Sequence, residues 1–212
     1  WVRTGTEAQP SEASIFSGLT LEEMEAGPHR AEAARARLER LRAPRREVRI
    51  GEVKVMLAEH AEAPFSSPDW LYEIKYDGFR LLGAREGPAA RLLYRRGHDA
   101  THVFPEIARA LRALPVGDRV LDGEAVVRDE SGRPSFQSLQ KRVQLQRPAD
   151  IERASWRWPA TLFVFDLLAF EGFDLRGLPL AERKGLLAGL LPTEGPLRLC
   201  DHVAEEGEAF YE

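Results

Sequence analysis

Residues 73–80, with the sequence EIKYDGFR, constrain the fold of this chain more than any other stretch. Large apolar residues alternate with polar ones before it, and apolar residues resume after the turn-forming pair Asp77-Gly78. This pattern predicts two strands within residues 71–82, joined by a turn. Lys75 would then lie at the end of the first strand, and Arg80 would lie on the second.

Lys75 is a candidate nucleophile. A free lysine has a pKa near ~10.4, so only roughly one side chain in two thousand is neutral at pH 7. Attack on an electrophile therefore requires burial or neighbouring cations that lower this pKa. The alternative interpretation is an ordinary hairpin that carries a surface lysine and a surface arginine.

The composition limits the class of protein. A chain of 212 residues has room for one large domain, or for one domain with an appendage. Its hydrophobic content of 43% suffices for a core, and no apolar run approaches the roughly 18 residues of a membrane span. Cys200 is the only cysteine, which excludes a disulfide framework and a cysteine-based zinc site and fits a reducing, cytoplasmic setting.

Charge gives a weaker signal. The net charge of −4 argues against a general binder of polyanions, but basic residues cluster within 30–49, 91–98 and 141–147. Each cluster alone is more typical of a solvated face. The chain begins at Trp1 rather than methionine, and we expect a segment of a longer protein.

The first part of the chain differs in texture from the rest. Residues 1–17 are polar and predict a linker. Thr20 and Glu23 form a capping-box pattern that opens a short helix, which Gly27-Pro28 would end, and a second helix is expected over residues 29–41. We therefore expect a linker and helical extension over 1–47 and a folded domain over 48–212.

From residue 48 the pattern is dominated by strands. The best strand candidates are 71–82, 91–94, 119–128, 161–170 and 197–202, with turns at 86–88, 129–132 and 171–172 and helices over 105–114 and 180–191. Strands linked as hairpins, with helices between some of them, predict an α+β fold with antiparallel sheets and flanking helices.

Four further groups of chemically suggestive residues follow Lys75. They are 94–101 with 104–106, 120–127, 136–142 (a loop or short helix) and 162–168. Each has a plain structural interpretation when it is taken alone. Glu124 would be on the exposed face of an edge strand, Phe165 would be core, and Arg95 would be a solvated arginine.

In this order the groups resemble the covalent nucleotidyltransferase superfamily of ATP-dependent DNA ligases, RNA ligases and mRNA capping enzymes. Bacterial non-homologous end-joining ligases are the most similar. Residues 75–80 resemble the nucleophile motif of that family, and 95–97 with 104–106, 122–124, and 165–168 with Gly172 resemble the three motifs after it. Residues 55–58 resemble the family's Pro-Met-Leu-Ala entry, with Val55 in place of proline. The similarity covers about residues 48–192 and implies an ATP-grasp-like adenylation domain.

The resemblance also implies a reaction and its residues. Lys75 would attack the α-phosphorus of ATP, and the resulting lysyl-AMP would pass its AMP to the 5′-phosphate of a DNA nick, which the 3′-OH then seals. The implied nucleotide contacts are Arg80 and Arg95 on phosphate or ribose oxygens, Phe165 stacked on adenine, Glu73 on the adenine amino group with Ile74 beside it, and Glu124 on a ribose hydroxyl or on water bound to Mg²⁺ (or Mn²⁺).

The implied partners are nicked or broken double-stranded DNA and an end-binding repair protein, with no membrane, in the bacterial cytosol or nucleoid. Two departures from the family pattern matter. Residues 94–97 read Tyr-Arg-Arg-Gly where end-joining ligases commonly have Ser-Arg-Asn-Gly, so the partner of Arg96 is open. The two later lysine-bearing motifs and the OB-fold do not occur before Glu212, so we expect this chain alone to bind ATP or AMP weakly and to seal no nicks.

Two other functions stay open at this point. A GTP-using capping enzyme or an RNA ligase would use the same scaffold, and labelling with ATP or GTP distinguishes it. A non-catalytic nucleic-acid-binding module would keep only the fold, and it would bind DNA in a salt-dependent manner without being adenylated.

Overall fold

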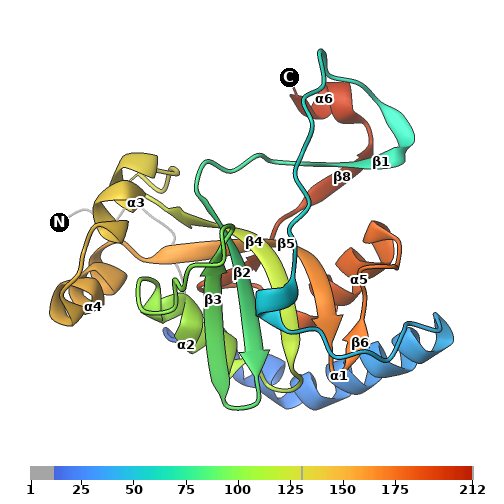
Figure 1. The fold of residues 1–212 in the computed structure, drawn as a ribbon, viewed down its shortest axis with the longest axis horizontal. Helices are drawn as coiled ribbons and strands as arrows, with labels where there is room; N and C mark the ends of the chain where they lie inside the picture. The colour runs from blue at the N-terminus through green and yellow to red at the C-terminus, as the bar shows by residue number, and fades with distance from the viewer. Residues whose placement is uncertain (1–11, 130, 212) are drawn as a thin grey trace, which may run out of the picture.

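A computed structural model describes residues 12–129 and 131–211 of the chain. Its centre is a six-stranded sheet of β2 (Phe79–Glu86), β3 (Ala89–Tyr94), β4 (Arg119–Val127), β5 (Ala160–Phe170), β6 (Phe173–Asp174) and β7 (Leu197–Leu199) (Figure 1). The order is β3-β2-β4-β5-β6 with antiparallel neighbours, and β7 pairs with β5 in parallel. A two-stranded sheet of β1 (Ser67–Glu73) and β8 (His202–Glu205), with the short helix α6 (Gly207–Tyr211), projects away from this centre (Figure 1). The predicted α+β class with antiparallel sheets is confirmed.

The two faces of the central sheet are covered differently. Helices α1 (Leu21–Arg40), α2 (Pro105–Ala113) and α5 (Leu180–Leu190) contribute to the main apolar core on one face. On the other face, residues 48–55, which include the 3-10 turn η1 (Ile50–Glu52), pack on Leu82, Ala84 and Val120. Side chains alternate between the faces along a strand, so Arg80 and Glu124 lie on this second face, beyond the part that residues 48–55 cover.

Helix α1 is continuous, so the predicted break at Gly27-Pro28 is wrong. The capping box at Thr20 and Glu23 is present, as predicted. Gly27, Ala31 and Leu38 are buried, whereas Pro28 is exposed. Because the helix is held against the body on both sides of the proline, packing outweighs the hydrogen bond that proline cannot donate. Residues 1–11 of the predicted linker lie outside the described residues, as does residue 130 of a predicted turn.

The two strands predicted within 71–82 are present, with Arg80 on the second, but they do not pair with each other, and Lys75 lies beyond the end of the first. β1 ends at Glu73 and β2 begins at Phe79, and the two strands belong to different sheets. A Cβ on Gly78 would lie 2.2 Å from the carbonyl oxygen of Ala125 on β4, so only glycine allows the chain to enter the central sheet here. The predicted strand 197–202 is likewise divided, between β7 and β8.

Two helices, α3 (Phe136–Val143) and α4 (Pro148–Arg157), pack beside α2 and the end of β4 (Figure 1). α3 was one of two alternatives in the sequence, and α4 was not predicted. Arg142, from one of the basic clusters, is buried and forms an ion pair with Glu106 (2.6 Å), whose carboxylate also accepts a hydrogen bond from the Ala160 N–H (2.7 Å). Glu106 lies in one of the motif-like groups, and its contacts here are those of a core residue.

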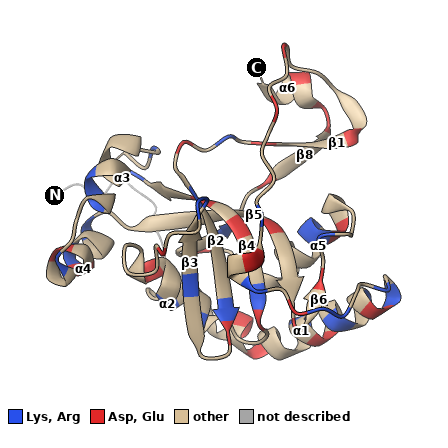
Figure 2. Cartoon of the chain, viewed as in Figure 1, with Lys and Arg blue, Asp and Glu red and all other residues tan. Residues whose placement is uncertain are grey.

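The arginines of residues 30–49 fit the expectation of solvated faces. Residues of both signs are interspersed along α1 (Figure 2). Arg35 pairs with Glu171 (2.7 Å), and Arg37 pairs with Glu182 of α5 (2.6 Å). These pairs tie α1 to the sheet and to α5, so the helical segment of the predicted extension packs directly on the body.

Candidate active site

A two-point ion pair joins β2 to β4 at the centre of the candidate site. The Nε and Nη2 atoms of Arg80 donate to the two carboxylate oxygens of Asp122 at 3.0 and 2.7 Å. The Nη1 atom donates to the carbonyl oxygen of Met56 at 2.6 Å. The bond to Asp122 raises the pKa of Arg80, and burial raises the pKa of Asp122 against the opposing effect of Arg80. The guanidinium is therefore fixed in position, and three of its five N–H donors are used.

Glu124 lies directly opposite Arg80 in the register of β2 and β4. Burial raises its pKa to about 7, although Arg80, Lys75 and a hydrogen bond from the Gly78 N–H each act to lower that value. A carboxyl with this pKa changes its charge near neutral pH. Perturbed carboxyls of this kind, with specific charged neighbours, are typical of functional sites.

Lys75 lies in the segment 74–78, which crosses from the two-stranded sheet to the central sheet, and its side chain is exposed. Its charge acts on Glu124, so Lys75, Arg80 and Glu124 are electrostatic neighbours. The sequence predicted that these three residues belong to one site, and the fold brings them to the same end of the sheet.

Aromatic rings continue the site along β5. The Arg80 guanidinium lies 5.3 Å from the centre of the Phe165 ring, which is partly buried. Tyr76 stacks on Phe163, with ring centres 4.0 Å apart and planes 13° apart. Cys200 packs with them, and burial raises the pKa of its thiol to about 11, which favours the protonated thiol at neutral pH. The arrangement leaves Phe165 beside the cations as a candidate platform for a flat ring.

Glu73, at the end of β1, is tied to helix α5. Its carboxylate accepts a hydrogen bond from the Lys184 ammonium, which also donates to the carbonyl oxygens of Phe165 (3.3 Å) and Cys200 (3.2 Å). Glu73 remains partly exposed, whereas Lys184 is buried. This contact connects β1 to the strand that carries Phe165.

Two of the predicted site residues, Ile74 and Arg95, are exposed. Ile74 is 53% exposed beside Lys75. Arg95 lies in the turn after β3, and its side chain forms no hydrogen bond or ion pair with another residue of the described ranges. The turn is closed by Gly97, with φ of +84° and an N–H bonded to Tyr94. Because Tyr94 pairs with Leu81, this turn lies next to the strand that carries Arg80.

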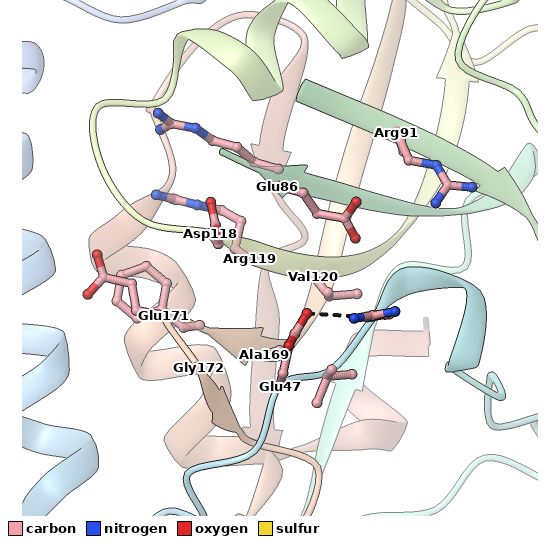
Figure 3. Close-up of a pocket in the computed structure, with 13 residues that line it drawn as sticks. Glu47, Glu86, Arg91, Asp118, Arg119, Val120, Ala169, Glu171 and Gly172 are labelled. Carbon is pink, nitrogen blue, oxygen red and sulfur yellow. Dashed lines mark hydrogen bonds and ion pairs between the residues drawn. The ribbon is translucent and has the colours of Figure 1, made fainter. Parts of the chain in front are cut away.

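A cavity of about 500 Å³ lies elsewhere, at the opposite end of the central sheet (Figure 3). Several of its charged residues have partners within the protein. Glu47 pairs with Arg49 at 3.3 Å, Arg119 donates to the Gly117 carbonyl at 3.0 Å, and Glu171 accepts from Arg35. None of the predicted site residues lines this cavity. We therefore place the site on the open face around Arg80 and not in this cavity.

Sequence reasoning missed three residues of this arrangement. Asp122 was within a quoted motif but received no role, although a carboxylate in a buried strand needs a cation nearby. Tyr76 was read only as a strand residue. Lys184 offered no local signal beyond a lysine within an apolar helical pattern, because its partner Glu73 is 111 positions away.

The side chains of the site suit a divalent metal ion. In the part of the chain that the structure describes, no three or more His, Cys, Asp or Glu side chains gather at a potential metal site. Mg²⁺ is commonly held by one or two carboxylates together with substrate phosphates, and Glu124 fits that mode. The described helices include none that is long and apolar enough to span a membrane.

The chain is similar in sequence to known DNA ligases. The multifunctional non-homologous end joining protein LigD of Pseudomonas aeruginosa is 43% identical over 141 residues, which are 65% of this chain and 16% of that protein. DNA ligase C of Mycobacterium tuberculosis is 35% identical over 145 residues, which are 68% of this chain and 39% of that protein. The chain thus spans much less than two thirds of these relatives.

Solved structures agree with the sequence comparison. The ligase domain of M. tuberculosis LigD superposes with a TM-score of 0.62 at 30% identity, covering 76% of this chain and 49% of that one. A mycobacterial DNA ligase D complexed with ATP and MES gives a TM-score of 0.61 at 29% identity, covering 76% and 50%. A family model described as "ATP dependent DNA ligase domain" matches residues 55–206. This chain therefore belongs to the family of ATP-dependent DNA ligase domains.

Proposed function

We propose that the full-length protein is a DNA ligase that uses Lys75 to form a covalent lysyl-AMP. One observation carries this proposal. The charge of Lys75 acts on Glu124, which lies opposite Arg80 in the sheet, and the fixed guanidinium of Arg80 lies near the Phe165 ring. Phosphoryl transfer requires from a protein mainly positioning and charge neutralisation, and this arrangement offers both.

The first step is adenylation of the enzyme. The Lys75 amine, after losing a proton, bonds to the α-phosphorus of ATP, and the bond to pyrophosphate breaks. Arg80 retains two N–H donors after its bonds to Asp122 and Met56, and these suit phosphate or ribose oxygens. Arg95, which has no partner among the described residues, extends the same positive edge.

The nucleoside would lie against the aromatic part of the site. Phe165 stacks on the base, Glu73 accepts a hydrogen bond from the adenine amino group, and Ile74 contacts the base from the connecting segment. Glu124 would bind a ribose hydroxyl, or it would hold Mg²⁺ (or Mn²⁺). A bound divalent ion would neutralise phosphate charge at this position.

The later steps involve DNA. AMP passes from Lys75 to the 5′-phosphate of a nick or break, and the 3′-OH then displaces AMP to join the strand. The proposed setting is double-strand-break repair in the bacterial cytosol or nucleoid, with an end-binding protein as the partner. The LigD relatives are named for non-homologous end joining, which supports this assignment.

The test is adenylation of the full-length protein with [α-³²P]ATP and Mg²⁺. We expect one AMP on the Lys75 peptide by mass spectrometry, lost in acid because phosphoramidates are acid-labile. Lys75→Ala should abolish the label, whereas Lys141→Ala, which removes an exposed lysine of α3, should retain it. Labelling by GTP in place of ATP would contradict the proposal. So would DNA binding without any adenylation.

Nick sealing is tested separately on a 5′-phosphorylated nicked duplex with ATP. The labelled protein should transfer AMP to the nick and produce a joined strand. An adenylated protein that joins only RNA would move the assignment to the RNA ligases.

A further inference from the structure

Lys184 lies on helix α5, and its charged side chain is buried. Its side chain is 1% exposed, although it lies on α5 behind the candidate active site. The ammonium has three N–H donors, and it has three acceptors, which are the Glu73 carboxylate and the carbonyls of Phe165 and Cys200. A buried ammonium needs such compensation, and this one is fully satisfied.

The three acceptors come from different parts of the fold. Glu73 ends β1, Phe165 is within β5, and Cys200 follows β7. The ammonium therefore fixes the end of the two-stranded sheet relative to the central sheet. It does so two residues before Lys75 and next to the ring proposed to stack on the base.

The contact also fixes one of the two oxygens of the Glu73 carboxylate. Its Oε1 atom is bound to Lys184, and its Oε2 atom accepts no hydrogen bond from any other residue within the described ranges. The Glu73 side chain is 28% exposed, so the carboxylate is not sealed from a ligand. An ionised carboxylate accepts hydrogen bonds and cannot donate them.

We infer that Lys184 is a positioning residue that binds one oxygen of the Glu73 carboxylate and leaves the other as the acceptor for a ligand, so that the site selects a purine with an amino group at C6. The inference rests on the proposed function, in which Glu73 faces the nucleobase. The 6-amino group of adenine donates to Oε2. The 6-carbonyl of guanine would place two acceptors against each other, and Lys184 has no free N–H to relieve them.

The test compares three nucleotides on the full-length protein. ATP carries the 6-amino group, purine riboside triphosphate lacks it, and GTP has a carbonyl in its place. A hydrogen bond to a charged group corresponds to a preference of about 10-fold or more, so the unsubstituted protein should be adenylated by ATP with at least that advantage in kcat/KM over purine riboside triphosphate.

In Lys184→Met the advantage of ATP should fall to within about threefold, mainly through a higher KM for ATP, while the values for purine riboside triphosphate change little. A purely structural role of Lys184 would lower the values for both nucleotides equally, and that result would overturn the inference. Lys141→Met, at an exposed site on α3, is the matched control and should keep the full preference.

Glu73→Gln provides an independent arm if Lys184→Met does not fold, as judged by its thermal unfolding. The amide can still accept from Lys184 and can turn its NH₂ group to the base, so discrimination against GTP should weaken about 10-fold or more. Unchanged discrimination would overturn the inference. Absence of adenylation in the unsubstituted protein would instead reject the proposed function, so the two failures are distinct.

Discussion

The central sheet and the segment 74–78 contribute to one site, but they are held in different ways. Arg80 and Asp122 lie on neighbouring strands and are locked by two hydrogen bonds. Lys75 is exposed on a segment that is fixed near its two ends, by Glu73 with Lys184 and by Gly78 with Glu124. The charges that would meet the phosphates are preorganised, whereas the nucleophile must be ordered when the nucleotide binds.

The sheet and the segment should also differ in how far a substitution changes stability and how far it changes the reaction rate. A charge pair within a sheet must be satisfied for the fold itself, so substitutions there affect stability and rate together. An exposed lysine contributes little to the fold. The predictions below test this difference between the sheet and the segment.

After Lys75, whose replacement should abolish adenylation, the largest effect is expected at Arg80. Arg80→Ala removes a fixed charge contact to the nucleotide, which typically costs about 2–4 kcal/mol of transition-state stabilisation, or on the order of 10²–10³ in the adenylation rate. The measurement is single-turnover adenylation. Because the substitution also leaves Asp122 buried without its partner, the rate should be measured again in Arg80→Ala/Asp122→Asn. Recovery of the rate in the double variant would show that Arg80 serves only the fold.

Gly78 is where the segment meets the sheet, and it gives the next effect. A Cβ here would lie 2.2 Å from the Ala125 carbonyl oxygen, so Gly78→Ala must displace the backbone. Overpacking of this kind typically costs about 1–3 kcal/mol, and it would also move the Gly78 N–H away from Glu124. We expect a lower Tm and slower adenylation. Gly51→Ala, where no atom lies within 4 Å of the new Cβ, is the control, and an equal loss in both variants would contradict the argument.

The strands that carry Arg80 and Glu124 could be predicted from local patterns, whereas the roles of these two residues came from resemblance to the family. The division between β1 and β2 could not be read in this way. Two strands joined by a turn at Asp77-Gly78 are typical of a hairpin, and only the close approach of Gly78 to β4 shows that the second strand enters a different sheet.

Long-range packing explains the other differences. Pro28 is a local stop signal, yet α1 continues because Gly27 and Ala31 are buried against the body. Lys184 and Glu73 are 111 positions apart, and neither residue alone indicates the other. Glu106 lies in a group that resembles a family motif, and its buried partner Arg142 could not be identified from spacing.

Glu124 interacts with both the central sheet and the segment 74–78, and its pKa predicts that the stability of the protein depends on pH. Its pKa is raised by burial to about 7, above its unfolded value near ~4.3. Between these values the native state binds more protons than the unfolded state, so the free energy of unfolding falls as pH rises from about 4.5 to about 7. With solvent screening of a partly exposed carboxyl, we expect a change on the order of 1–2 kcal/mol.

Chemical denaturation across this pH range provides the measurement. Glu124→Gln should remove that part of the slope. Its free energy of unfolding should therefore fall less between pH 5 and pH 7 than that of the unsubstituted protein. An identical slope in both proteins would place the pKa of Glu124 near its ordinary value and would remove the physical basis for this prediction.

The smallest effect is expected at Arg96, which tests the edge of the site. Arg96 is exposed in the same turn as Arg95, and its side chain has no hydrogen bond or ion pair with any residue of the described ranges. An exposed charge without a fixed geometry typically contributes less than about 1 kcal/mol, so Arg96→Ala should slow adenylation less than about tenfold. Arg95→Ala is the matched comparison in the same turn, and it should have the larger effect if Arg95 reaches the nucleotide. A loss of rate in Arg96→Ala as large as that in Arg80→Ala would contradict this expectation. It would mean that an exposed arginine in a turn contributes as much to adenylation as an arginine fixed on the sheet.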